Sequence, residues 1–141
     1  MSYKVFISHG SGKDDTVMAT ILEEKLSERG VDSFLDHIDV GMGIDFRSRI
    51  RTELQGCDEL FCILSPDSIS RPWVAAEVGA AFALQKTIVP ITVYIGDEDL
   101  QKSGFTSLLG TVAPVSFADL MLDFDSYFEA TKNRMEEKGN A

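Results

Sequence analysis

Hydrophobic residues along this chain follow two periods in turn, one typical of strands and one typical of helices. Short runs rich in β-branched and aromatic residues, such as KVFIS and ELFCIL, indicate buried strands. Between them, apolar residues recur every three or four positions, which is typical of helices with one buried face. The predicted strands span residues 4–8, 31–35, 59–64, 87–94 and 112–117, and the predicted helices span 14–30, 46–56, 68–86 and 119–138.

This regular alternation of strands and helices predicts an α/β fold. A strand, a helix and a second strand form a unit whose strands run parallel and whose helix covers one face of the sheet. Repetition of the unit gives a five-stranded parallel sheet with helices on both faces. The length of 141 residues suits one compact domain. Pro90 lies inside the fourth strand and has no backbone N–H, so we expect a bulge there or a stretch that is unpaired on one side.

The composition excludes several classes of partner. A formal net charge of −10 argues against nucleic acid or an anionic membrane as the main partner, because such surfaces are bound through clustered Lys and Arg. No apolar run reaches the roughly 18 residues of a membrane helix, and the start of the chain lacks the anatomy of a signal peptide. Cys57 and Cys62 fit neither a CxxC nor a Cys/His pattern. We therefore expect a cytoplasmic protein.

One acidic residue, Glu77, lies in the middle of the apolar segment SISRPWVAAEVGAAFALQK. Residues 72–85 include no other charged side chain. Burial of an ionised carboxylate is costly unless a partner stabilises it, so Glu77 needs a partner or a function. Trp73 lies one helical turn earlier on the same face. Pro72 suits the first turn of this helix and Ser70 suits its N-cap, which places Trp73 and Glu77 near the helix start.

Polar residues follow the first three predicted strands, at the ends where open parallel sheets bind ligands. They are Ser8 and His9 after the first strand, Asp36 after the second, and Ser65 after the third. The third turn leads directly into the helix that carries Trp73 and Glu77. An indole beside a carboxylate suits a ligand with a flat ring and a developing positive charge, because the ring stacks on the indole and the carboxylate stabilises the cation.

Four segments of the chain resemble a Toll/interleukin-1 receptor (TIR) domain of the bacterial kind: KVFISHGSG, FLDHIDVGMGIDF, CDELFCILSPDSISRPWVAAEVGAAF and KTIVPI. The similarity covers Lys4 to about Ile91 and, more loosely, the remainder. It implies a single TIR domain over residues 1–141, with a flavodoxin-like strand order. Many members of the family cleave NAD at the nicotinamide glycosidic bond, using a glutamate on the helix after the third strand. Glu77 occupies that position, and Trp73 precedes it by four residues.

The resemblance implies an NAD nucleosidase or ADP-ribosyl cyclase, with Glu77 as the catalytic residue and Trp73 as the wall on which a ring stacks. NAD is then the substrate, and we expect no cofactor and no metal ion. The product is ADP-ribose or a cyclic isomer. The other predicted substrate-binding residues are Phe6, Ser8, His9 and Asp36 around the ribose and phosphates, and Arg47, with Arg51, near the pyrophosphate.

The loop from Asp36 to Asp45 carries an unusual number of apolar residues for a surface connection, which indicates a lid or an interface. These residues are Ile38, Val40, Met42 and Ile44. In the family that the chain resembles, this loop mediates contacts between domains, and a neighbouring copy often completes the site. We therefore expect self-association to activate the enzyme. The short chain indicates control by a regulatory protein or domain, and the resemblance alone implies a role in immune signalling against phage.

Other interpretations stay open at this point. Glu77 is a half-exposed surface residue in one of them, Trp73 is a core residue in another, and Ser8 and His9 merely cap a turn in a third. A TIR adaptor without catalytic activity shares the fold, and so does an enzyme similar to nucleoside deoxyribosyltransferases. A response-regulator receiver fits poorly, because Ser8-His9-Gly10 and Ser65-Pro66 stand where that class needs acidic residues.

Overall fold

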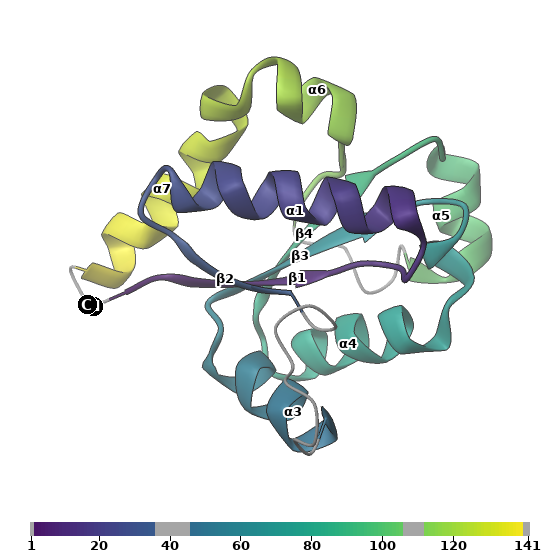
Figure 1. The fold of residues 1–141 in the computed structure, drawn as a ribbon, viewed down its shortest axis with the longest axis horizontal. Coiled ribbons are helices and arrows are strands. Elements are labelled where there is room, and N and C mark those ends of the chain that lie inside the picture. Colours follow the sequence, from purple (N-terminus) through teal and green to yellow (C-terminus); the bar gives the residue numbers. More distant parts are fainter. Residues whose placement is uncertain (1, 36–45, 106–111, 140–141) are drawn as a thin grey trace.

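A computed structural model describes residues 2–35, 46–105 and 112–139 of the chain, and among these residues the core is a five-stranded sheet (Figure 1). The strands are β1 (Lys4–Ser8), β2 (Asp32–Leu35), β3 (Glu59–Leu64), β4 (Thr87–Thr92) and β5 (Val115–Ser116). Their order is β2-β1-β3-β4-β5, and every neighbouring pair is parallel. The predicted parallel sheet and its flavodoxin-like order are therefore confirmed. This order reverses between β1 and β3, where ligands bind in folds of this class.

Helices cover both faces of the sheet, as predicted. They are α1 (Lys13–Ser27), α3 (Phe46–Gly56), α4 (Pro72–Ala83), α5 (Asp97–Ser103), α6 (Phe117–Leu122) and α7 (Phe124–Gly139), with a short 3-10 helix at Ser68–Ser70. Figure 1 shows α1, α6 and α7 on one side of the sheet and α3 and α4 on the other. None of the helices within the described ranges has the length and apolar content needed to cross a membrane.

Each face of the sheet has its own hydrophobic core, because side chains of a strand point alternately to its two faces. Val5 and Ile7 pack with α1, whereas Phe6 packs with α4 on the opposite face. All six residues of β3 are buried, as expected for a central strand covered on both sides. Ser8 follows Phe6 by two positions and therefore points toward the α4 face, where a hydrogen bond to an α4 side chain confirms its direction.

Proline positions explain two local features of the sheet and its helices. Pro90 pairs in register with Cys62 of β3, and no bulge interrupts this ladder. On its other side, β4 pairs with β5 only through Ile91 and Thr92, so the predicted stretch of partial pairing is confirmed within the described residues. Pro72 begins α4 as predicted, but the expected cap at Ser70 is wrong. Its hydroxyl donates to the Asp67 carbonyl instead, and Arg71 occupies the N-cap position.

Local capping explains the elements that the hydrophobic pattern placed incorrectly. The predicted strand at 112–117 is reduced to Val115–Ser116, and it ends there because the Ser116 hydroxyl accepts a hydrogen bond from the Asp119 N–H and starts α6. The predicted helix at 119–138 is two helices, because Asp123 leaves the helical region with φ −147° and ψ 64°. Helix α5 was not predicted. Only Leu100 is buried in it, so its seven residues carry almost no periodic signal.

The amino end of the sheet is held by a buried ion pair that was also not predicted. Glu59, at the start of β3, is 0% exposed. Arg134 of α7 donates to both of its carboxylate oxygens, at 2.9 and 2.8 Å, and the hydroxyls of Tyr3 and Thr131 donate to it as well. This two-pronged geometry neutralises the buried charge and joins α7 to the sheet.

Candidate active site

Glu77 is buried against the sheet, at the carboxyl end of β1. Its side chain is 2% exposed, and Oε1 accepts a hydrogen bond of 2.7 Å from the Ser8 hydroxyl. The helix explains this position, because Val74 and Ala81 lie three residues before and four residues after Glu77 and are buried on the same face of α4. The interpretation of Glu77 as a half-exposed surface residue is therefore wrong.

Two neutral polar groups from neighbouring strands lie near the Glu77 carboxylate. Ser8 ends β1 and pairs in register with Cys62 of β3. Cys62 is fully buried, and burial, followed by the negative charge of nearby Glu77, raises the pKa of its thiol. The thiol therefore stays protonated at neutral pH. The Ser8 hydroxyl stabilises the Glu77 carboxylate by donating a hydrogen bond to it.

Trp73 lies at the surface of the protein, one helical turn from Glu77. Its side chain is 40% exposed, so the interpretation of Trp73 as a core residue is wrong. Positions four apart share one side of a helix, which places an accessible indole on the same side of α4 as the buried carboxylate. An exposed aromatic surface of this kind can stack on a flat ligand.

The other predicted site residues lie in different environments. Ser8 and His9 are 0% and 3% exposed, and His9 Nδ1 donates to the Gly10 carbonyl at 2.7 Å. Phe6 is also 0% exposed and packs against Phe34 with 5.3 Å between ring centroids, so the structure places it in the core and not at a ligand-binding surface. Arg47 lies exposed in the first turn of α3. Asp36 and the predicted interface residues Ile38, Val40, Met42 and Ile44 lie outside the described residues.

A second group of buried polar residues lies beside the site and was missed at the sequence level. Asp15 is 4% exposed, and its Oδ2 accepts a hydrogen bond of 2.8 Å from the Ser65 hydroxyl. Burial raises the pKa of the Asp15 carboxyl; the hydrogen bond from Ser65 lowers it, and the charge of Asp67 raises it further. The spacing contains the signal, because Asp15 precedes the buried residues Ala19 and Leu22 by four and seven positions on α1.

A pocket of about 360 Å³ opens next to this group, between the start of α1 and the segments that follow β3 and β4. Lys13, Met18, Pro66 and Tyr94 are among its lining residues. Tyr94 is 95% exposed and has a left-handed φ of 56°. The pocket lies at the carboxyl end of the sheet, on the α1 side.

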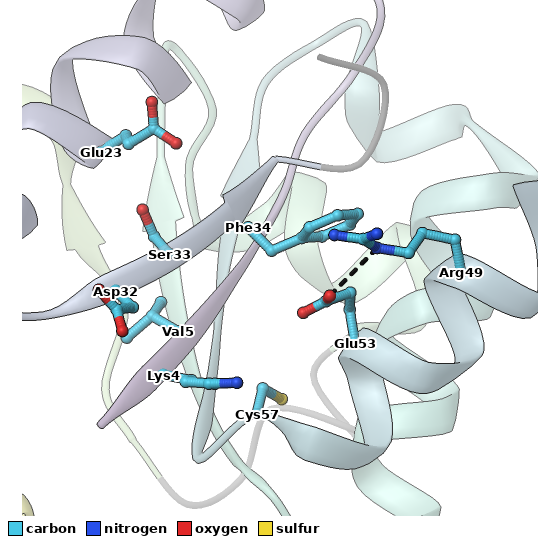
Figure 2. Close-up of a pocket in the computed structure, with 9 residues that line it drawn as sticks. All are labelled: Lys4, Val5, Glu23, Asp32, Ser33, Phe34, Arg49, Glu53 and Cys57. Atoms are coloured by element: carbon cyan, nitrogen blue, oxygen red, sulfur yellow. Dashed lines mark ion pairs between the residues drawn. The ribbon is translucent and has the colours of Figure 1, made fainter. Parts of the chain in front are cut away.

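A separate pocket of about 440 Å³ lies at the opposite, amino ends of β1 and β2 (Figure 2). Its lining includes Lys4, Asp32 and Cys57, together with Arg49 of α3, whose guanidinium lies 5.6 Å from the centre of the Phe34 ring. Figure 2 shows Arg49 paired with Glu53, at 3.1 Å. Because this pocket lies at the amino ends of the strands, away from Ser8 and Glu77, it is separate from the site at the carboxyl ends.

Comparison with curated protein sequences shows similarity to a plant protein. It is a protein of the grass Brachypodium distachyon described as "Probable 2' cyclic ADP-D-ribose synthase BdTIR". The two are 28% identical over 98 residues, which cover 70% of this chain and 44% of the relative. The chain therefore spans less than half the length of the curated protein it matches. Because this relative is a plant protein, the bacterial subtype stays a prediction.

Solved structures show the same fold at low sequence identity. The TIR domain of the Toll-related receptor TRR-2 from Hydra magnipapillata superimposes with a TM-score of 0.67 at 19% identity, over 92% of this chain and 98% of that one. The TIR domains of the activated Roq1 resistosome give a TM-score of 0.64 at 16% identity, over 95% and 77%. The family model of the TIR domain matches residues 5–132. The chain belongs to the TIR domain family.

Proposed function

We propose that this TIR domain cleaves NAD at the bond between nicotinamide and ribose. The observation that carries the proposal is the buried Glu77 carboxylate, which rests on the Ser8 hydroxyl one helical turn from the exposed Trp73. The name of the curated relative supports it, because cyclic ADP-ribose is a product of NAD cleavage. The chain and that relative share only part of their length, so the activity itself needs a direct test.

The chemistry follows from the charges that change during the reaction. The nicotinamide ring of NAD is already cationic, so when its glycosidic bond breaks, the electron pair goes to the ring nitrogen and neutral nicotinamide leaves. No general acid is needed. A positive charge then develops on the ribose, and the Glu77 carboxylate stabilises it. Attack by water gives ADP-ribose and releases a proton, whereas attack by a hydroxyl or the adenine of the same molecule gives a cyclic product.

Each side chain of the site has a proposed task in this reaction. Trp73 stacks on the nicotinamide ring and orients it. Ser8 donates a hydrogen bond to Oε1 of Glu77 and thereby fixes the orientation of the carboxylate group. His9 and Asp36 bind the ribose and phosphates, and Arg47 of α3 contributes positive charge for the pyrophosphate.

We also propose how the enzyme is controlled. Self-association, mediated by the loop that contains Ile38, Val40, Met42 and Ile44, raises activity by completing the site with a neighbouring copy. The TIR domains of the Roq1 resistosome belong to an assembly, which supports this idea by analogy of fold. We place the protein in the cytoplasm, as a single TIR domain under a regulatory partner in an antiphage signalling system.

The direct test is incubation of the purified protein with NAD, followed by mass analysis of the products. We expect nicotinamide together with ADP-ribose or with a cyclic form of ADP-ribose that is lighter by one water. The Glu77→Gln variant, folded to the same extent, is the control. If the wild type releases no nicotinamide at any protein concentration but still self-associates, the domain is an adaptor. Consumption of a deoxynucleoside in place of NAD indicates an enzyme of the deoxyribosyltransferase type.

A further inference from the structure

The loop that follows β1 has no room for a side chain at Gly10 unless a neighbouring side chain moves. A Cβ atom built on Gly10 lies 2.4 Å from Asp15 Oδ2, 2.8 Å from Asp67 Oδ2 and 3.1 Å from Ser68 Cβ. The corresponding atom on Gly12, two residues later in the same loop, meets Asp67 Oδ2 at an ordinary 3.4 Å. The carboxylates of Asp15 and Asp67 therefore lie against the backbone of Gly10, two residues after Ser8.

Hydrogen bonds connect the same carboxylate of Asp15 to the loop that follows β3. The Ser65 hydroxyl donates to Asp15 Oδ2 at 2.8 Å. The Ser65 N–H donates to the Ser68 hydroxyl at 2.8 Å, and the Ser68 N–H donates to the Ser65 hydroxyl at 3.0 Å. The Ser68 hydroxyl in turn donates to the Ile63 carbonyl of β3. Asp15 thus joins α1, the loop after β1 and the loop after β3 at one point.

The position of the Glu77 carboxylate is linked to the contact between Asp15 and Gly10 by a short stretch of chain. Its partner Ser8 is separated from Gly10 only by His9, which is itself buried. A movement of Gly10 away from Asp15 is therefore passed to the Ser8 hydroxyl, and from there to the Glu77 carboxylate. The interior at this place is closely packed, so little of such a movement can be absorbed.

We propose that Asp15 is a positioning residue for Glu77, acting as a clamp between Ser65 and Gly10 that fixes the loop carrying Ser8. This inference rests on the proposed NAD cleavage, because it assigns Asp15 a role in that reaction. Asp15 does not touch the substrate in this scheme. A misplacement of a reacting group by about 1 Å can lower a rate by roughly a hundredfold, so a partial loosening is expected to cost roughly tenfold.

The charge of Asp15 argues for a role beyond holding the fold together. Its carboxylate loses hydration on burial. Three titratable residues influence its charge: Asp67 from the loop after β3, His9 from the loop after β1, and Asp14 of its own helix. Two of these neighbours are acidic. A clamp that served stability alone would be better made by a neutral side chain.

The test compares Asp15→Asn with Asp14→Asn, an exposed neighbour that removes the same charge from the same helix turn. We expect Asp15→Asn to lower kcat for nicotinamide release roughly tenfold while KM changes by less than about twofold, because positioning acts on the transition state. Asp14→Asn keeps the wild-type values. Gly10→Ala and Gly12→Ala form a second matched pair, in which only the Gly10 variant is expected to lose kcat.

Hydrogen–deuterium exchange of the His9 and Gly10 amides provides a readout that does not depend on activity. Faster exchange in Asp15→Asn than in Asp14→Asn, together with the loss of kcat and an unreduced Tm, supports the clamp. A merely structural role predicts that Tm and kcat fall together. Equal exchange in the two variants overturns the clamp, and so does unchanged kcat. If the wild type releases no nicotinamide but the Asp15→Asn and Asp14→Asn variants still differ in exchange, the proposed function is overturned and the clamp is not.

Discussion

Two glutamates of this domain are buried to almost the same degree but at opposite ends of the sheet. Glu59, at the amino end of β3, accepts two hydrogen bonds from the Arg134 guanidinium and others from Tyr3 and Thr131. Glu77, near the carboxyl end of β1, accepts its hydrogen bond from the neutral Ser8 hydroxyl. The Glu59 carboxylate is thus held by an ion pair, whereas the Ser8 hydroxyl holds Glu77 through a neutral hydrogen bond. The comparison contrasts a carboxylate that joins two elements through an ion pair with a carboxylate that we propose acts on a substrate.

The largest expected effect comes from breaking the structural pair. Arg134→Met leaves the Glu59 carboxylate buried without its cation and should lower the free energy of unfolding by about 3 kcal/mol, since Arg134 itself is partly exposed. Urea unfolding measures this loss. Nicotinamide release per folded molecule should stay at the wild-type rate, and a large loss of that rate would show that the two glutamates are not independent.

Glu77→Gln should show the reverse pattern. We expect a loss of NAD cleavage of roughly a hundredfold or more, on the scale of removing a preorganised charge from a transition state. The midpoint of urea unfolding should change little, because the amide keeps the shape of the side chain and an oxygen that accepts from Ser8. Wild-type turnover in a folded Glu77→Gln variant would remove the catalytic role of this residue.

Trp73→Ala should have a smaller effect that falls mainly on substrate binding. Stacking of a base on an aromatic side chain contributes about 1–3 kcal/mol, so KM for NAD should rise roughly tenfold. The stability of the variant should be close to that of the wild type, because the indole is 40% exposed. Phe82→Ala is a suitable control, since this α4 residue is 54% exposed and lies farther along the helix. Equal KM values for the two variants would argue against the stacking wall.

The smallest effect concerns the dependence of stability on pH. Burial raises the pKa of the Asp15 carboxyl above its usual value near 4. Stability from a group of this kind is fully present below the unfolded-state pKa and is lost as the pH rises through the folded pKa. Asp15→Asn should therefore be slightly more stable than the wild type at pH 7, with the difference closing toward pH 4. Thermal unfolding at the two pH values, beside Asp14→Asn, checks the sign; a lower Tm of Asp15→Asn at pH 7 contradicts it.

The parallel sheet could be predicted because buried strands leave strong apolar runs, whereas its strand order was implied by the resemblance to TIR domains. ELFCIL predicted β3 with the bounds that the structure has. Short elements leave no such signal, and their ends depend on single capping groups. Helix α5 lies between Gly96 and the left-handed Gly104, and the Ser116 hydroxyl ends β5 by starting α6. Such groups act locally, and hydrophobic periodicity does not report them.

The same contrast applies to the buried charges. Glu77 could be identified because it is the one charge in a long apolar helix. Asp15 follows the spacing of the buried face of α1 but stands beside Asp14 at a helix start, where acidic residues are common for another reason. Glu59 could not be recognised as buried, because its cation comes from α7, 75 positions later in the sequence. Phe6 lies on the same face of β1 as Ser8, and the pattern alone could not tell that it is sealed in the core.

Trp73 is the single tryptophan of the chain. Under excitation near 295 nm, the fluorescence of the whole protein therefore originates from one indole, at the proposed stacking site. A stacked pyridinium accepts electrons and quenches indole fluorescence, so binding of NAD at this site should give an optical signal that needs no label. The same natural chromophore then reports inhibitors, which need only compete for its surface.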